Sequence, residues 1–201
     1  MKKIFSISLL FFSLLVFSQK KWDLKFYNEL AGNEYIIYAD NSEIMPMSVK
    51  FSFKMINLKS SIANDENIVI PADTKRFLVA KITPLNPREG NQFSYTTTFN
   101  FGNAIQETFD EDYLYSLPFG KGKTHLIYQG YYGKFSHQKD AALDFDMKIG
   151  DPVYAAREGT VVLTEDSNLQ GCPKISCAKF NNKVLIMHSD GTFADYAHLK
   201  Y

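Results

Sequence analysis

Alternating apolar and polar positions recur along the first half of the chain and predict β-strands. From Val49 to Met55, odd positions are all apolar and even positions are all polar, which is typical of a strand with one face in a core and the other in water. Residues 93–101 repeat this pattern, and shorter strands are expected at 67–70 and 77–83, where turn-forming residues border the apolar runs. Because no long stretch has helical spacing, residues of about 30 to 110 are expected to form a small antiparallel sandwich.

A connector separates this region from the rest of the chain. Leu117–Gly122 contains one proline and two glycines, a composition that marks turns and linkers. Beyond it, glycines separate short strand-like runs. The chain is therefore expected to be all-β, with an N-terminal antiparallel β-sandwich-like domain at residues 19–116 and a second antiparallel β-sheet domain at residues 117–201.

The first 18 residues have the layout of a secretory signal peptide. Lys2 and Lys3 precede an apolar run, Ile4–Phe17, and Ser18 offers a small residue for cleavage before Gln19. An uncleaved anchor helix is the alternative, but the apolar run is too short for a stable membrane span. The mature protein is expected in the periplasm, in the cell envelope or outside the cell.

Charge composition argues against nucleic acid as a partner, and the cysteine content predicts the oxidation state of the two thiols. The chain carries 22 Lys and Arg against 22 Asp and Glu, so it lacks the basic footprint of a nucleic-acid-binding protein. Its two cysteines, Cys172 and Cys177, enclose a short loop, and an exported protein is expected to oxidise such a pair to a disulfide. A metal role is the alternative, although structural zinc sites usually need four ligands.

A histidine and two carboxylates lie close together in the second half. His137 precedes a run in which Asp144 and Asp146 alternate with apolar residues, so both carboxylates are expected on one face of a strand. Imidazole nitrogen and carboxylate oxygen are both zinc ligands. Taken alone, the pattern is more commonly explained by an ordinary surface pair of His and Asp.

Sequence motifs throughout the second half of the chain support the interpretation of a metal site. Four segments carry these motifs: Tyr-Gln-Gly-Tyr-Tyr-Gly-Lys-Phe-Ser-His (128–137), Ala-Leu-Asp-Phe (142–145), Gly-Asp-Pro-Val-Tyr-Ala-Ala-Arg-Glu-Gly-Thr-Val-Val (150–162) and His-Ser-Asp-Gly-Thr-Phe-Ala-Asp-Tyr-Ala-His-Leu (188–199). In order and in residues they closely resemble the lysostaphin/LytM-type (M23) metallopeptidases, and the resemblance covers roughly residues 113–201.

The resemblance implies a zinc site and assigns its residues. His137 and Asp144 match the first two zinc ligands, and His198, in Tyr-Ala-His-Leu, matches a catalytic histidine beside the metal. In many family members the first His and Asp are four residues apart, whereas here they are seven apart. This departure leaves Asp140 and Asp146 as alternative ligands, with Asp144 preferred, and either Asp146 or a backbone carbonyl is expected to orient His137.

The pairing of the last two strands separates His198 from His188. Asp190-Gly191 predicts a two-residue hairpin turn, and pairing outward from it sets His188 opposite Phe193 and places His198 on the other face. His188 is therefore expected to be a partly buried structural residue, and His125 likewise.

One part of the family pattern is missing from this chain. Family members supply a third zinc ligand and a second catalytic histidine from a His-Leu-His motif several dozen residues after Tyr-Ala-His-Leu, whereas this sequence ends three residues after His198. The second domain is thus expected to be an incomplete M23-type sheet. As a fragment, the chain is expected to bind zinc poorly and to be inactive.

Three functions remain open at this point. The resemblance favours a zinc metalloendopeptidase that cleaves peptide cross-links of bacterial peptidoglycan. The main alternative is a non-catalytic M23-like module that binds the envelope and regulates other cell-wall hydrolases. An envelope-structural protein or adhesin is the third, but it rests on the N-terminal domain alone.

Overall fold

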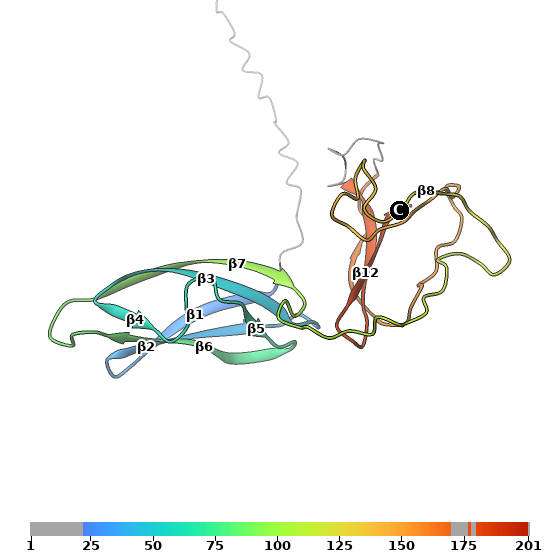
Figure 1. The fold of residues 1–201 in the computed structure, drawn as a ribbon. Helices are drawn as coiled ribbons and strands as arrows, with labels where there is room; N and C mark the ends of the chain where they lie inside the picture. Colours follow the sequence, from blue (N-terminus) through green and yellow to red (C-terminus); the bar gives the residue numbers. More distant parts are fainter. Residues whose placement is uncertain (1–21, 170–176, 178–179, 201) are drawn as a thin grey trace, which may run out of the picture.

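The computed structural model describes residues 22–169, 177 and 180–200, and within them the chain is all-β (Figure 1). Every strand pairing is antiparallel, and no α-helix occurs in these residues. The strands are β1 (Leu24–Ala31), β2 (Glu34–Asn41), β3 (Met47–Ile56), β4 (Leu58–Ser60), β5 (Ile68–Ile70), β6 (Thr74–Pro84), β7 (Gln92–Phe101), β8 (Ile127–Gln129), β9 (Asp144–Phe145), β10 (Thr160–Glu165), β11 (Asn182–Met187) and β12 (Phe193–Leu199).

The first seven strands form two sheets that share one hydrophobic core. One sheet has the order β1-β2-β6-β4 and the other the order β5-β3-β7, and the two are drawn one above the other in Figure 1. Ile37 and Ile82 come from the first sheet and Phe51 from the second, and all three are fully buried in one cluster. The ring of Phe26 meets that of Phe51 edge-on, with centroids 5.2 Å apart, so aromatic contacts join the sheets.

Strand β3 confirms the alternation that was used to predict it. Val49, Phe51 and Phe53 are buried, whereas Lys50 and Ser52 between them are exposed. The N-terminal sheets begin before residue 30, where the sandwich was expected to start. Strand β1 starts at Leu24, and Leu24 and Phe26 pack against the core. β1 and β2 are joined at Gly32, whose φ of +63° is a conformation that glycine adopts without strain.

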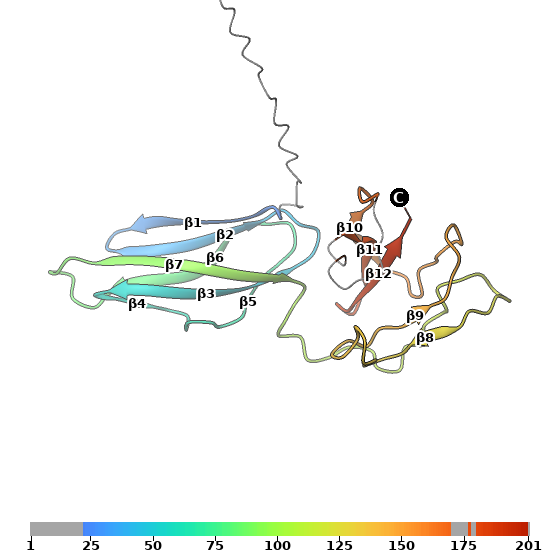
Figure 2. The ribbon, with the colours of Figure 1, turned by 90° about the horizontal axis from the view of Figure 1, so that it is seen from above.

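The C-terminal strands form a separate three-stranded sheet, β10-β11-β12, and a two-stranded ribbon, β8-β9 (Figure 2). The three-stranded sheet packs on the end of the N-terminal sheets through a second cluster, in which Met45 and Met47 meet Val162 and Leu185. No strand was found between β7 and β8, over residues 102–126.

The turn between β11 and β12 differs from the two-residue hairpin predicted from Asp-Gly. The N–H of Gly191 donates to the carbonyl of His188 (3.0 Å), and the N–H of His188 donates to the carbonyl of Thr192 (2.8 Å). The central residues are thus Ser189 and Asp190, and Gly191 follows them at φ +80°. This is the three-residue loop with a glycine bulge. It pairs Met187 with Phe193, so the predicted pairing of His188 with Phe193 was wrong by one residue.

Two predictions fall wholly or partly outside the described residues. The signal peptide, residues 1–18, lies outside them, and so does Cys172. Cys177 is disulfide-bonded. In the part of the chain that the structure describes, no helix is long and apolar enough to cross a bilayer.

Candidate functional site

His137 and Asp144 lie side by side, as the sequence motifs predicted. Nε2 of His137 is 3.3 Å from Oδ1 of Asp144, and the two side chains are only 11% and 23% exposed. Asp144 is the first residue of β9, and His137 comes from the loop that follows β8. The site is therefore built across the β8–β9 ribbon, whose register places Gln129 opposite Asp144.

Backbone hydrogen bonds fold the loop so that His137 turns back towards the ribbon. The N–H of Gly133 donates to the carbonyl of Gly130, and the N–H of His137 donates to the carbonyl of Gly133, both at 3.2 Å. The carbonyl of His137 then accepts from the N–H of Asp140 at 3.0 Å. The first two turns direct His137 towards the ribbon, and the third lies between residues 137 and 144. A spacing of seven residues therefore still brings the two side chains together.

The imidazole of His137 is held by its other nitrogen. Nδ1 lies 3.4 Å from the carbonyl oxygen of Gly130, and a carbonyl can only accept, so this contact assigns the proton to Nδ1. In a neutral imidazole, Nε2 then presents a lone pair to Oδ1 of Asp144. Metal-binding histidines commonly have this second contact, because it fixes the tautomer and the ring orientation.

The distance between the two facing atoms suits two ligands of one zinc ion. With bonds of about 2.0–2.1 Å and tetrahedral angles, two zinc ligands lie about 3.3–3.4 Å apart. A charge-assisted N–H···O hydrogen bond is shorter, about 2.7–2.9 Å. Since Nε2 of His137 and Oδ1 of Asp144 are 3.3 Å apart, a cation between them would satisfy two lone pairs that otherwise face each other. The spacing of these two atoms is therefore compatible with two of the ligands of a zinc ion.

The two alternative carboxylates lie in different surroundings. Asp140 and Asp146 are both exposed, and their backbone N–H groups donate to the carbonyls of His137 and Leu126. The carboxylate that lies against the imidazole of His137 is that of Asp144. Its ring contact is with a backbone carbonyl and not with Asp146, so the carbonyl alternative is the one observed.

His198 lies at an irregular point of β12. The pairing of β11 with β12 shifts between Asn182 and Lys183, which leaves His198 as the extra residue of a β-bulge. It is exposed and has a φ of +61°, and left-handed residues and bulges often occur where a side chain is re-aimed at a functional site. Among the described residues, no group of three His, Cys, Asp or Glu side chains is arranged to hold a metal. The catalytic role of His198 stays a prediction.

The other two histidines lie in contacts of their own. His188 is 2% exposed, and its Nδ1 is 2.7 Å from the carbonyl oxygen of Glu158. His125 is half-buried, with Nδ1 3.0 Å from the carbonyl of Asp146 and its ring 4.7 Å from that of Phe119. The structural role expected for both agrees with these surroundings.

A buried ion pair near the β11–β12 turn was not anticipated from the sequence. Arg157 is 5% exposed and donates to Oδ2 of Asp190 at 2.8 Å, and its guanidinium lies 3.9 Å from the centre of the Tyr113 ring. The hydroxyl and N–H of Thr192 also donate to Asp190. These donors, with Thr192 the main cause, hold the pKa of Asp190 well below its usual range.

Gln129 is the other residue that sequence reasoning did not single out. Its side-chain amide nitrogen donates to Oδ2 of Asp144 at 2.9 Å. The register of the β8–β9 ribbon could have identified it, because it places the two residues opposite each other. That ribbon is too short to show a recognisable alternation.

Comparisons with known proteins gave no match, since no protein-family model, curated protein or solved structure is detectably similar to the chain. The assignment to a family therefore rests on the motifs of the sequence, and the site rests on the geometry above.

Proposed function

We propose that the protein is an exported zinc metalloendopeptidase that cleaves peptide cross-links of bacterial peptidoglycan. The observation that carries the proposal is the pairing of the buried His137 with the partly buried Asp144, two zinc-type ligands with their facing atoms 3.3 Å apart. The sequence motifs point to the same two residues. An accidental surface pair would not be expected to be buried, oriented and spaced in this way.

The roles of the chain's own residues follow from their chemistry. Nε2 of His137 and Oδ1 of Asp144 would hold the zinc ion, and the carbonyl of Gly130, which lies 3.4 Å from Nδ1, would keep the imidazole in the required tautomer. Bound zinc supplies a Lewis acid that acidifies water and polarises the scissile carbonyl. His198 is assigned to orient the attacking water or to donate to the developing oxyanion, since an imidazole can do either near neutral pH.

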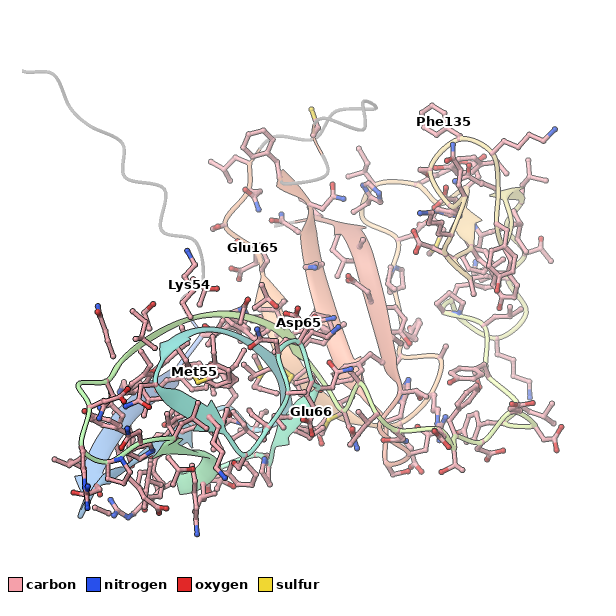
Figure 3. All side chains as sticks on the ribbon, turned by 60° about the vertical axis from the view of Figure 1, so that its left-hand side comes forward. Lys54, Met55, Asp65, Glu66, Phe135 and Glu165 are labelled. Carbon is pink, nitrogen blue, oxygen red and sulfur yellow. The ribbon has the colours of Figure 1, made fainter. Side chains whose placement is uncertain are left out.

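Exposed aromatic side chains beside the site favour a large polymeric substrate over a small molecule held in an enclosed pocket. The loop that carries His137 exposes Tyr131, Tyr132 and Phe135, each at least 60% accessible, and Phe135 projects from the outer part of this loop in Figure 3. Exposed apolar groups that gather in this way mark interaction surfaces. A polymer with an extended peptide can contact such a rim while its bond lies at the metal.

Hydrolysis of purified peptidoglycan by the complete gene product, without its leader, tests this proposal. We expect new amino termini and shortened cross-links in the wild type and in the control His125→Ala. His137→Ala and Asp144→Ala should lose both zinc and hydrolysis. His198→Ala should retain zinc and lose hydrolysis, because its assigned role is in the reaction and not in metal binding.

Two results would contradict the proposal. Hydrolysis that survives in His137→Ala and Asp144→Ala would show that the reaction does not use this site. Binding of the wild type to peptidoglycan without zinc and without cleavage would instead identify a non-catalytic module.

A further inference from the structure

Gln129 lies at the end of β8, directly opposite Asp144 in the ribbon. Its amide nitrogen donates to Oδ2 of Asp144 at 2.9 Å and to Oγ of Ser136 at 2.7 Å. Its amide oxygen accepts from the backbone N–H groups of Phe135 and Ser136, at 3.2 and 3.3 Å. Both donors and both lone pairs of the side chain are therefore used.

This set of partners leaves a single orientation for the amide. A flipped amide would place its oxygen against the carboxylate of Asp144 and its NH₂ group against the N–H groups of Phe135 and Ser136. Like partners would then face each other at the carboxylate and at both backbone N–H groups, whereas the hydroxyl of Ser136 could adapt to either orientation. The network thus fixes which atom points at Asp144.

The contacts of Gln129 join the two sides of the site. Asp144 is held directly, and Ser136, the residue before His137, is held through both its N–H and its hydroxyl. On Asp144, Gln129 occupies Oδ2, while Oδ1 is the oxygen that faces His137. One side chain therefore sets the rotamer of the carboxylate and the position of the loop that delivers the imidazole.

The loop is shaped to admit this side chain. A Cβ on Gly133 would lie 2.5 Å from Cγ of Gln129 and 3.0 Å from the carbonyl oxygen of Gly130. Only a residue without a side chain leaves this space open. The carbonyl of Gly133 also accepts the N–H of His137, so the same glycine packs on Gln129 and turns the chain towards the site.

We propose that Gln129 is a positioning residue for the metal site: it reserves Oδ1 of Asp144 for the metal by holding Oδ2, and it sets His137 at the matching distance. This inference rests on the proposed function, because it assigns Gln129 a purpose at the zinc site. A merely structural glutamine would hold the loop and leave zinc affinity unchanged. A positioning glutamine must affect both.

The test uses Gln129→Met, which keeps an unbranched side chain of similar length and removes every hydrogen bond of the amide. Gln138→Met is the matched control, since Gln138 lies in the same loop and donates only to the carbonyl of Lys134 among its recorded hydrogen bonds. Two quantities are measured on the complete gene product without its leader. They are zinc affinity, by competition with a chromophoric chelator, and hydrogen exchange at the N–H groups of Phe135 and Ser136.

Gln129→Met is expected to bind zinc about 10–100-fold more weakly than the wild type, which is the usual effect of losing a partner of a metal ligand. Exchange at Phe135 and Ser136 should become faster because their acceptor is lost. Gln138→Met should change neither quantity. If Gln129→Met does not fold, Ser136→Ala removes one of the four contacts, and a smaller but measurable loss of zinc affinity is expected.

The failures are distinguishable. A wild type with measurable zinc affinity and a folded Gln129→Met with the same affinity would overturn the positioning role and leave the zinc site intact. Unchanged affinity in Ser136→Ala, where it is the variant tested, would do the same. A wild type with no zinc affinity would overturn the proposed function, and this inference with it.

Discussion

Nε2 of His137 lies 3.3 Å from Oδ1 of Asp144, although seven residues separate them in the sequence and neither belongs to a long strand. Three successive turns between Gly130 and Asp140 bring the histidine back to the ribbon. The longer spacing is therefore compatible with a two-ligand arrangement. Of the three turns, the one from His137 to Asp140 lies within this spacing, and the two side chains still meet.

Gly133→Ala tests whether packing in the loop sets the site. The added methyl group would collide with Cγ of Gln129, so the side chain must move and release Asp144. We expect zinc affinity to fall by about the same 10–100-fold as in Gln129→Met. Gly130→Ala is the control, because a Cβ there meets nothing within 4 Å. Equal zinc affinity in the two alanine variants would show that the contact is unimportant.

Phe51→Ala tests the core of the N-terminal sheets. Phe51 is fully buried and contacts the rings of Phe26 and Tyr95. Its truncation should lower the free energy of unfolding by about 3–5 kcal/mol, because it removes apolar contacts and leaves a cavity. Phe99→Ala, at a site that is 46% exposed, should cost clearly less. Urea denaturation measures both, and similar losses would place the core elsewhere.

Asp190 is expected to make the free energy of unfolding decrease as the pH becomes acidic. Hydrogen bonds from Thr192, and then the guanidinium of Arg157, lower its pKa in the folded protein, whereas the unfolded chain titrates near about 3.9. A lowered pKa means that Asp190 stabilises the fold above about pH 4 and that this stabilisation is lost as the pH falls further. The midpoint of urea unfolding should therefore decrease between about pH 6 and pH 3.

The variant Asp190→Asn should have a lower midpoint at about pH 6 and a smaller decrease on acidification. The matched control is Asp166→Asn, which changes an exposed aspartate. If Asp190→Asn and the wild type lose the same stability on acidification, the account of Asp190 is wrong.

The sequence was informative where one local rule decided the structure. Period-two alternation located β3, because burial of one face is a property of the strand itself. The Asp-Gly turn signal failed at the β11–β12 turn, because Asp-Gly suits both a two-residue and a three-residue hairpin loop. The choice depended on Asp190, which forms tertiary contacts with Arg157 as well as local ones with Thr192. No local pattern contains that information.

The candidate site divides in the same way. His137 and Asp144 could be named because metal ligands are limited to a few residue types and occur in a recognisable motif. Gln129 could not, since glutamine has no distinctive spacing and its contacts depend on the β8–β9 register. The bulge that carries His198 is also a matter of pairing between strands, and an alternation rule cannot predict an inserted residue.

The zinc content of the protein tests the central claim most directly. The complete gene product, expressed from Gln19 onward, is loaded with zinc, freed of excess metal and analysed by elemental mass spectrometry. We predict about one zinc ion per molecule in the wild type and in His125→Ala, and almost none in His137→Ala or Asp144→Ala, because a catalytic zinc site normally needs three protein ligands. Full zinc content in the folded His137→Ala and Asp144→Ala variants, or none in the wild type, would contradict the assignment of this site.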